Sequence, residues 1–320
     1  MPRPRILIVS PASARDNNGN WQSASRWARF LRADCRVDIA SGWFGEDAAP
    51  DLLVALHARR SAAALAVFKA AHPQRPAVLV LTGTDVYRDI EHDASARTSL
   101  ELADAIVVLQ DDALERLPAH VRDKATVIHQ SAPPLAPYAG PTRRVREICM
   151  IGHLRPEKDP LTFMRAASLI DMPGLHLTHV GGVLDPALGQ AAEEEARTNP
   201  RYRWLGALPR SRTRQILKRS DAMAIASLME GGANVIIEAV TCGVPVLASD
   251  IGGNVGMLGR DYAGYFTAGD AHGLARLAER SVRDPAFHAL LQRQCAARAP
   301  LFAPSREQAL LRDLVDNLLR

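Results

Sequence analysis

Short apolar runs rich in β-branched residues alternate along the chain with stretches whose apolar residues recur every three or four positions. In the first part of the chain the runs occupy residues 6–9, 37–40, 52–56, 78–81, 106–109 and 127–128. Strands covered by helices on both faces read as unbroken apolar runs, because neither face meets water. The pattern therefore predicts an α/β domain with a parallel sheet between two layers of helices.

The first predicted helix carries a clear apolar stripe. Its members, at spacings of three and four, are Trp21, Ala24, Trp27, Ala28 and Leu31. A stripe of this width packs one helix face against a core. We expect it to lie on the sheet.

The alternation stops between residues 131 and 146, where the sequence SAPPLAPYAGPTRR carries four prolines and one glycine. Proline restricts the backbone and discourages both helix and strand, so we place an interdomain linker here. A second series then predicts strands at 148–151, 175–180, 202–205, 222–226 and 244–248. Helices are expected from about 160, through 193–197, through 212–219 and at 234–241.

The chain is thus expected to form two doubly wound, Rossmann-like domains, residues 1–140 and 141–300, followed by a helix at 301–320 that packs on a domain face. Ligands bind beyond the carboxyl ends of strands in such sheets, so the two domains should face a cleft. The final helices carry a leucine stripe, which we assign to the core rather than to a partner site. Its members are Leu310, Leu311, Leu314, Leu318 and Leu319.

Composition narrows the class of protein. A chain of 320 residues with 47% hydrophobic and 23% charged positions is globular, which excludes disordered and collagen-like proteins. The net charge of +4 and the 5% aromatic content give no surface suited to nucleic acid. The small positive excess does suit a pocket for anions.

The cysteines and the N-terminus indicate the compartment. Cys35, Cys149, Cys242 and Cys295 are far apart and lack the spacing of a zinc site, so we expect buried thiols in a reducing cytosol. The opening MPRPRILIVSPAS has too few apolar residues for a signal-peptide core or a membrane span. We therefore expect a cytoplasmic protein without a membrane partner.

The strongest chemical signal is the segment EGGANVIIEA, which begins at Glu230 and follows an apolar strand. Gly231 and Gly232 let the backbone approach a ligand closely, and the helix that starts near Ala233 directs free N–H groups at it. A phosphate is the natural occupant. Glu238, about one turn into the helix, could accept hydroxyl hydrogen bonds from a ribose. The plainer interpretation is a helix-terminal acid and a solvated face.

A second segment, GHLRPEKDP at 152–160, also lies between a strand and a helix. Arg155 and Lys158 stand at the carboxyl end of a strand with the same polarity as the Glu230 loop. Together they could neutralise a diphosphate and the charge that develops as it departs. The alternative is a surface turn with solvated charges.

The two segments, in this order after a proline-rich linker, resemble the glycosyltransferases of the GT-B fold, in particular the family four group that uses nucleotide sugars. The resemblance implies that Arg155 and Lys158 bind the donor diphosphate and Glu238 the ribose. It also implies that Glu230 faces the transferred sugar. The backbone around Gly231, Gly232 and Asn234 would bind the phosphates.

Two further segments match the family less well. The stretch 250–254 resembles its D-x-G-G-x-x-E segment but lacks the glutamate. After the first strand, Gly19 and Asn20 stand where the family often has a Gly-Gly loop, and could offer N–H groups to the donor, with charge from Arg15. An Asn-Gly turn that caps the helix is equally consistent with these residues.

Two loops at strand ends of the first domain are candidates for binding the acceptor. One contains His57, Arg59 and Arg60, and the other contains Thr84, Asp85 and Arg88. The arginines suit a small, highly charged anion better than a neutral sugar. Alternatively, the arginines of the first loop begin a helix on the surface.

The combination SPASARDNNGNWQSASRW, LTGTDVYRDI, GHLRPEKDP and EGGANVIIEA is also similar to the selenosugar synthases of bacterial selenoneine biosynthesis. That resemblance implies transfer of the hexose of a UDP-sugar, UDP-GlcNAc or UDP-glucose, to selenophosphate, with release of UDP. No cofactor is implied. A metal ion is not expected either, because no suitable loop carries an Asp-x-Asp pair of the kind that holds a divalent ion near a diphosphate. Asp111-Asp112 follows a strand but leads directly into a helix. His57 and Asp85 are candidates for orienting the acceptor.

Other functions fit the sequence as well. A family four glycosyltransferase could attach the hexose to an ordinary hydroxyl acceptor, and a non-hydrolysing UDP-sugar epimerase shares the fold. A two-domain ligand-binding protein also pairs α/β domains around a cleft.

Overall fold

The chain folds into two α/β units, each built on a parallel sheet. The structure, a computed structural model, describes residues 3–13, 19–45, 48–140 and 145–320. Unit 1 comprises residues 1–131 and 303–320, and unit 2 comprises residues 132–302. The chain thus leaves unit 1 after Ser131 and returns to it at Ala303.

Unit 1 contains a sheet whose order, within its described residues, is β2-β1-β3-β4-β5-β6, and these neighbouring strands pair in parallel. The strands are β1 (Arg5–Val9), β2 (Arg36–Ala40), β3 (Leu52–Leu56), β4 (Ala77–Val80), β5 (Ala105–Val108) and β6 (Ala125–Val127). The helices are α1 (Gly19–Leu31), α2 (Ala62–Ala71), α3 (Ile90–His92), α4 (Ala94–Leu102), α5 (Asp111–Glu115) and α13 (Pro304–Leu318). A π-helical turn η1 (Asp85–Asp89) and a 3₁₀ turn η2 (Ala119–Lys124) complete the unit.

Alternation along β1 divides the core of unit 1 between the two faces of its sheet. Ile6 and Ile8 are buried with α1 and α13 on one face, while Leu7 and Val9 join α2 and α4 on the other. Successive strand side chains point to opposite faces, so an all-apolar strand needs helices on both. The predicted α1 stripe is confirmed from Ala24 to Leu31, because its four members in that range are buried.

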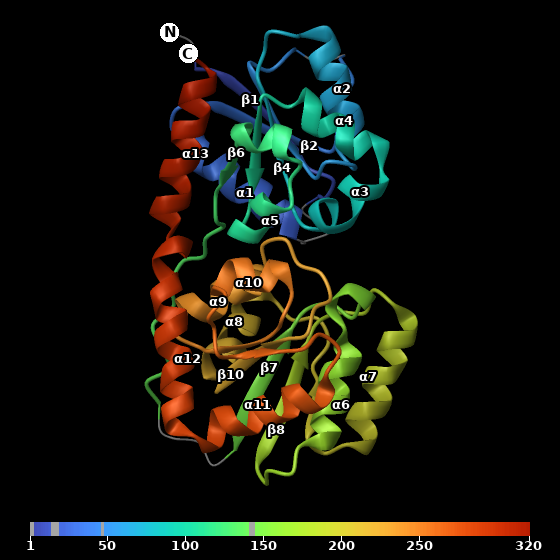
Figure 1. The fold of residues 1–320 in the computed structure, drawn as a ribbon, viewed down its shortest axis with the longest axis vertical. Coiled ribbons are helices and arrows are strands. Elements are labelled where there is room, and N and C mark those ends of the chain that lie inside the picture. The colour runs from blue at the N-terminus through green and yellow to red at the C-terminus, as the bar shows by residue number, and fades with distance from the viewer. Residues whose placement is uncertain (1–2, 14–18, 46–47, 141–144) are drawn as a thin grey trace. The chain divides into compact units, whose positions relative to one another are not determined.

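Helix α13 lies beside α1 in unit 1 (Figure 1). Its predicted leucine stripe is confirmed as core, because Leu311 is buried and the other four leucines pack against the same cluster. One polar group accompanies them. The Glu307 carboxylate, 1% exposed, accepts hydrogen bonds from Arg26 Nε at 2.8 and 3.0 Å, Trp27 Nε1 at 2.8 Å and Ser131 Oγ at 2.5 Å. Glu307 thereby joins α13 to α1 and to the end of the first segment of unit 1.

Unit 2 contains a second parallel sheet with the order β12-β11-β10-β7-β8-β9 in its described part. The strands are β7 (Arg146–Ile151), β8 (Leu175–Val180), β9 (Tyr202–Trp204), β10 (Ala222–Ile225), β11 (Val246–Ser249) and β12 (Tyr265–Phe266). The helices are α6 (Pro160–Leu169), α7 (Pro186–Thr198), α8 (Arg210–Arg219), α9 (Asn234–Thr241), α10 (Gly252–Leu258), α11 (Ala271–Arg283) and α12 (Pro285–Arg298), with 3₁₀ turns η3 (Pro156–Lys158) and η4 (Ala299–Phe302). The predicted strands and helices of this part are present, and β12 and α10 are additional.

In each sheet the first strand lies inside the strand order, so successive connections run outward in two directions. The reversal falls between β1 and β3 in unit 1 and between β10 and β7 in unit 2. At such a reversal neighbouring loops diverge to opposite faces of the sheet, which opens a crevice at the carboxyl edge. The loops after β3, β7 and β10 are therefore the first places to look for a site.

The four cysteines are free and buried, as predicted. Burial raises the pKa of each thiol. In the described part of the chain, none of the helices combines the length and apolar character needed to span a membrane.

Replacement of Glu307 tests the anchoring of α13. Glu307→Ala leaves the largely buried Arg26 without its anion, which costs about 3 to 5 kcal/mol in such pairs, so the free energy of unfolding should fall by that order in urea titration. Asp313→Asn, at an exposed position of the same helix, is the matched control and should change it by less than about 0.5 kcal/mol. A similar small loss for both variants would contradict the anchoring role.

Candidate functional site

The loops that follow β7 and β10 meet at the carboxyl edge of unit 2. Because the strands are parallel, these loops emerge at the same edge, and the two strands are direct neighbours. The N–H of Leu228, in the loop after β10, donates to the carbonyl of Glu157, in the loop after β7, at 2.9 Å. The two segments singled out in the sequence are therefore joined by their backbones.

Two glycines allow further loops to approach this pair. A Cβ on Gly181, after β8, would lie 1.8 Å from the carbonyl oxygen of Gly152, and a Cβ on Gly253, in α10, would lie 2.0 Å from that of Glu230. No side chain fits at such distances, so only glycine permits this packing. The loops after β8 and β11 are thereby pressed against those after β7 and β10.

His179 supports the start of the β7 loop from within the sheet. This fully buried side chain has its Nε2 at 3.0 Å from the carbonyl of Gly152 and its Nδ1 at 3.1 Å from the hydroxyl of Tyr202. A carbonyl can only accept, so Nε2 carries the hydrogen and Nδ1 accepts from Tyr202. Burial lowers the pKa of His179 to about 4, which keeps it neutral in this arrangement. In the sequence, this role is visible only as a histidine within an apolar strand.

Lys158 ends the turn η3 and reaches the loop after β10. The next residue, Asp159, adopts the left-handed conformation at φ 43° and caps α6 by accepting from the N–H and hydroxyl of Thr162 at 3.3 and 2.6 Å. The Lys158 ammonium forms an ion pair with Glu230 Oε1. The hydroxyl of Ser227 donates to the same oxygen at 2.5 Å.

Glu238 lies in the second turn of α9 and is held by a partner that the sequence analysis did not find. Arg210, at the start of α8, donates to Glu238 Oε1 from Nε at 3.0 Å and from Nη2 at 2.7 Å. Both Glu230 and Glu238 are largely buried, at 8% and 7% exposure, although each is an acid. Buried carboxylates of this kind persist because they are paired.

The remaining donor candidates of unit 2 lie on the same edge. Gly231, Gly232 and Asn234 carry the chain from Glu230 into α9, whose N-cap, Ala233, has no side chain that could bond the first N–H groups. The first N–H groups of α9 therefore have no side-chain cap, and they can bind an anion at the helix N-terminus. Arg155 is exposed at the start of η3. Burial and the neighbouring Arg155 charge lower the pKa of His153.

In unit 1 the acceptor candidates lie around the loop after β3. His57 is buried with φ at 75°, and its Nε2 lies 3.0 Å from the Thr84 hydroxyl. Burial lowers the pKa of His57, against the opposing effect of Asp85. The fully buried Asp85 carboxylate accepts from four backbone N–H groups, those of Ala58, Thr82, Gly83 and Val86. Asp85 thus joins the loops after β3 and β4, and its expected contact with an acceptor stays a prediction.

The arginines of unit 1 are partly neutralised. Arg59 Nε lies 2.9 Å and Arg88 Nε 3.2 Å from the carboxylate of Asp89, a residue that the sequence analysis did not select. Burial opposes ionisation of Asp89, but hydrogen bonds from both arginines lower its pKa overall. Arg60 is exposed beside them. Two arginines thus share the single carboxylate of Asp89.

The first loop of unit 1 is only partly described. Gly19 and Asn20 begin α1, and the carbonyl of Gly19 accepts from the hydroxyl of Ser23 at 2.8 Å. This contact belongs to the helix and leaves the predicted donor role untested. Arg15 lies outside the described residues.

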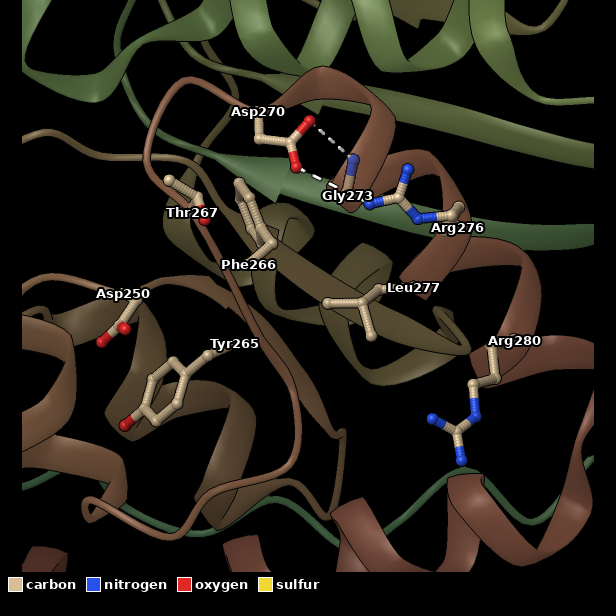
Figure 2. Close-up of a pocket in the computed structure, with 9 residues that line it drawn as sticks. All are labelled: Asp250, Tyr265, Phe266, Thr267, Asp270, Gly273, Arg276, Leu277 and Arg280. Atoms are coloured by element: carbon tan, nitrogen blue, oxygen red, sulfur yellow. Dashed lines mark hydrogen bonds and ion pairs between the residues drawn. The ribbon is translucent and has the colours of Figure 1, made fainter.

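A groove of about 520 Å³ lies in unit 2 between the carboxyl ends of β11 and β12 and helix α11 (Figure 2). Several of its polar groups are engaged within the protein. Asp270 accepts from Gly273 N–H at 2.9 Å and lies 3.8 Å from Arg276, and the Arg280 guanidinium stacks on Phe287 at 3.9 Å. The hydroxyl of Tyr265 donates to the carbonyl of Gly259 at 2.9 Å. The loops after β7 and β10, which bring together the two segments singled out in the sequence, define the better candidate site.

Solved structures define the class of fold. The chain superposes with a TM-score of 0.79 on sucrose-phosphate synthase from Thermosynechococcus elongatus, at 17% identity and 99% coverage of both chains. It superposes with a TM-score of 0.78 on Anabaena HepE in complex with UDP and glucose, at 16% identity, covering 98% of this chain and 100% of that one. These likenesses confirm the predicted GT-B architecture of two Rossmann-like domains.

The family follows from sequence. The model of the family described as glycosyl transferases group 1 matches residues 141–300, and the chain therefore belongs to this family. It is 28% identical to glycosyltransferase 1 domain-containing protein 1 of Xenopus tropicalis over 173 residues, 53% of this chain and 49% of that protein. A UDP-Gal:alpha-D-GlcNAc-diphosphoundecaprenol alpha-1,3-galactosyltransferase of Escherichia coli is 33% identical over 121 residues, 36% of this chain and 31% of that enzyme. The matched stretches thus span half or less of these relatives.

The lowered pKa of His179 predicts acid sensitivity. The unfolded chain takes up a proton near the ordinary pKa of 6.5, whereas the folded one does so near 4, so stability is full above 6.5 and falls between these values. The shift corresponds to about 3 kcal/mol. Glutamine keeps a donor and an acceptor but does not titrate. In urea titrations, the free energy of unfolding of His179→Gln should therefore fall on acidification by about 3 kcal/mol less than that of the wild type. Equal acid dependence of wild type and variant would contradict the assignment, and exposed His272→Gln serves as control.

Proposed function

We propose that this group 1 glycosyltransferase takes its hexose from a UDP-sugar bound at the carboxyl edge of unit 2. One observation carries the proposal: the ion pair between Lys158 and Glu230. A cation suited to a diphosphate and an acid suited to sugar hydroxyls are in direct contact there. The bond that breaks in a nucleotide sugar joins these two parts of the donor.

The neighbouring groups extend this assignment along the donor. Arg155, Lys158 and the N-terminus of α9 bind the diphosphate, and they stabilise the negative charge that grows on it as the C1–O bond breaks. Glu238, oriented by Arg210, binds the ribose hydroxyls. Structures of Anabaena HepE with UDP and glucose and with UDP-glucose support UDP-glucose as a donor to test first.

For the acceptor we favour a hydroxyl compound that carries negative charge. The three arginines of these loops, Arg59, Arg60 and Arg88, are exposed and support an anion. Names of relatives point the same way: two are D-inositol 3-phosphate glycosyltransferases of mycobacteria, 31% and 28% identical over 111 residues. Asp85 and His57 shape the two loops that present these arginines.

Selenophosphate is the second candidate acceptor, favoured by the same arginines. Its selenium would attack C1 of the hexose and form a C–Se bond while the C1–O bond breaks and UDP leaves. This anion is already nucleophilic and needs no general base, whereas a hydroxyl acceptor profits from one. In both reactions we propose that Lys158, Arg155 and the α9 terminus supply the charge that a metal ion supplies in other enzymes.

The free, buried cysteines support a reducing compartment as the place where the protein works.

Calorimetry with UDP tests the donor site. Loss of a charge-assisted contact costs about 1.5 to 3 kcal/mol, so Lys158→Ala and Glu238→Ala should each weaken UDP binding by roughly tenfold or more. Lys218→Ala and Glu193→Ala, which change the same residue types elsewhere in unit 2, should bind UDP as the wild type does. Undetectable binding of UDP by the wild type would refute the donor assignment.

Mass spectrometry distinguishes the acceptors. The protein is mixed with UDP-glucose or UDP-GlcNAc and either inositol phosphate or selenophosphate, with and without EDTA. We expect UDP release and a hexose adduct of an anionic acceptor, and the chelator should not change either. A product with the selenium isotope pattern would show that the protein accepts selenophosphate. UDP-sugar consumption without any acceptor would instead indicate an epimerase or a hydrolase.

A further inference from the structure

A buried chain of hydrogen bonds lies behind Glu230, and no step of the proposed reaction uses it. It begins at Ser227, a completely buried residue just after β10 whose hydroxyl donates to Glu230 Oε1 at 2.5 Å. The hydroxyl of Ser249, at the end of β11, donates to the carbonyl of Ser227 at 2.6 Å. The side-chain amide of Asn254, in α10, donates to the carbonyl and hydroxyl of Ser249 at 2.9 and 3.0 Å.

This chain fixes both the backbone and the side chain of the loop after β10. Ser249 and Asn254 are themselves completely buried, so the carbonyl of Ser227 has a fixed position. Gly253, next to Asn254, presses on the carbonyl of Glu230. Ser227 and Lys158 both donate to Oε1 of Glu230, which leaves the orientation of Oε2 determined by the planarity of the carboxylate.

We propose that Ser227 is a positioning residue that orients Glu230 toward the transferred hexose. The inference rests on the proposed function, in which Glu230 meets the sugar hydroxyls. Elsewhere in unit 2 a buried serine has a purely local role: the hydroxyl of Ser281 donates to the carbonyl of Ala278 in its own helix at 2.8 Å. At Ser227 the hydroxyl instead bonds to the carboxylate of another residue, which is a stronger acceptor than a carbonyl.

Ser227→Ala tests the proposal, with Ser281→Ala as the matched change of a buried serine. Because Ser227 acts on the acid that faces the sugar, affinity for UDP should stay unchanged in calorimetry. The kcat for UDP release from UDP-glucose, with inositol phosphate or selenophosphate as the acceptor, whichever the protein uses, should fall roughly tenfold. If Ser227→Ala proves too unstable to assay, Ser227→Cys replaces it, because cysteine has nearly the same size and is a weaker donor. This variant should show a similar loss of kcat. Ser281→Ala should keep both properties of the wild type.

A double-mutant cycle separates positioning from general damage. Glu230→Gln should lower kcat, and adding Ser227→Ala to it should cause little further loss, because the serine acts through that acid. Independent, multiplying losses would overturn the inference, as would wild-type kcat in both Ser227 variants. If the wild type binds no UDP, the proposed function fails first and this inference fails with it.

Discussion

Close approach of backbones is the constraint on which the candidate site depends. Four loops share the carboxyl edge of unit 2, and they can meet because Gly181 and Gly253 carry no side chain where they contact Gly152 and Glu230. A methyl group at either glycine would push apart the loops that carry the charged residues. Small residues thereby determine how the charged ones are placed, although they contribute no chemistry of their own.

Pairing of opposite charges is a common feature of both edges. Lys158 pairs with Glu230 and Arg210 with Glu238 in unit 2, and Asp89 holds two arginines in unit 1. A partly buried acid is costly without such a partner. The same pairing fixes side chains that would otherwise sample many rotamers, so a ligand meets oriented groups and loses less entropy on binding.

The fold was largely predictable because its strands are unbroken apolar runs. Where prediction erred, local chemistry explains it. The strand expected at 244–248 begins two residues later, since Gly243 is left-handed at φ 74° and Pro245 offers no N–H to the ladder. Strand β12 spans two residues, too few to show a period, and α10 opens with two glycines, which disfavour helices.

For the site, sequence reasoning found the residues that carry charge but not those that hold them. Arg155, Lys158, Glu230 and Glu238 stand in segments with a recognisable glycine and charge pattern. His179 and Arg210 act through contacts between strands or between helices, and such contacts leave no local pattern. Ser227 lies three residues before Glu230, but a serine in a loop carries no signal of its own. Asp85 illustrates the converse, because a conspicuous acid in a loop turned out to bond to four backbone N–H groups.

Helix α13 makes unit 1 discontinuous along the chain. The helix follows unit 2 in the sequence, yet its apolar face completes the core of unit 1, whose strands precede unit 2. Residues 132–302 are therefore inserted between the two segments of unit 1. Unit 2 is one continuous segment that could be exchanged as a whole, whereas unit 1 consists of two segments. Recombination between relatives that aims to combine one acceptor preference with another donor preference must therefore transplant two separated stretches together, or leave Leu311 and Val315 without their original partners.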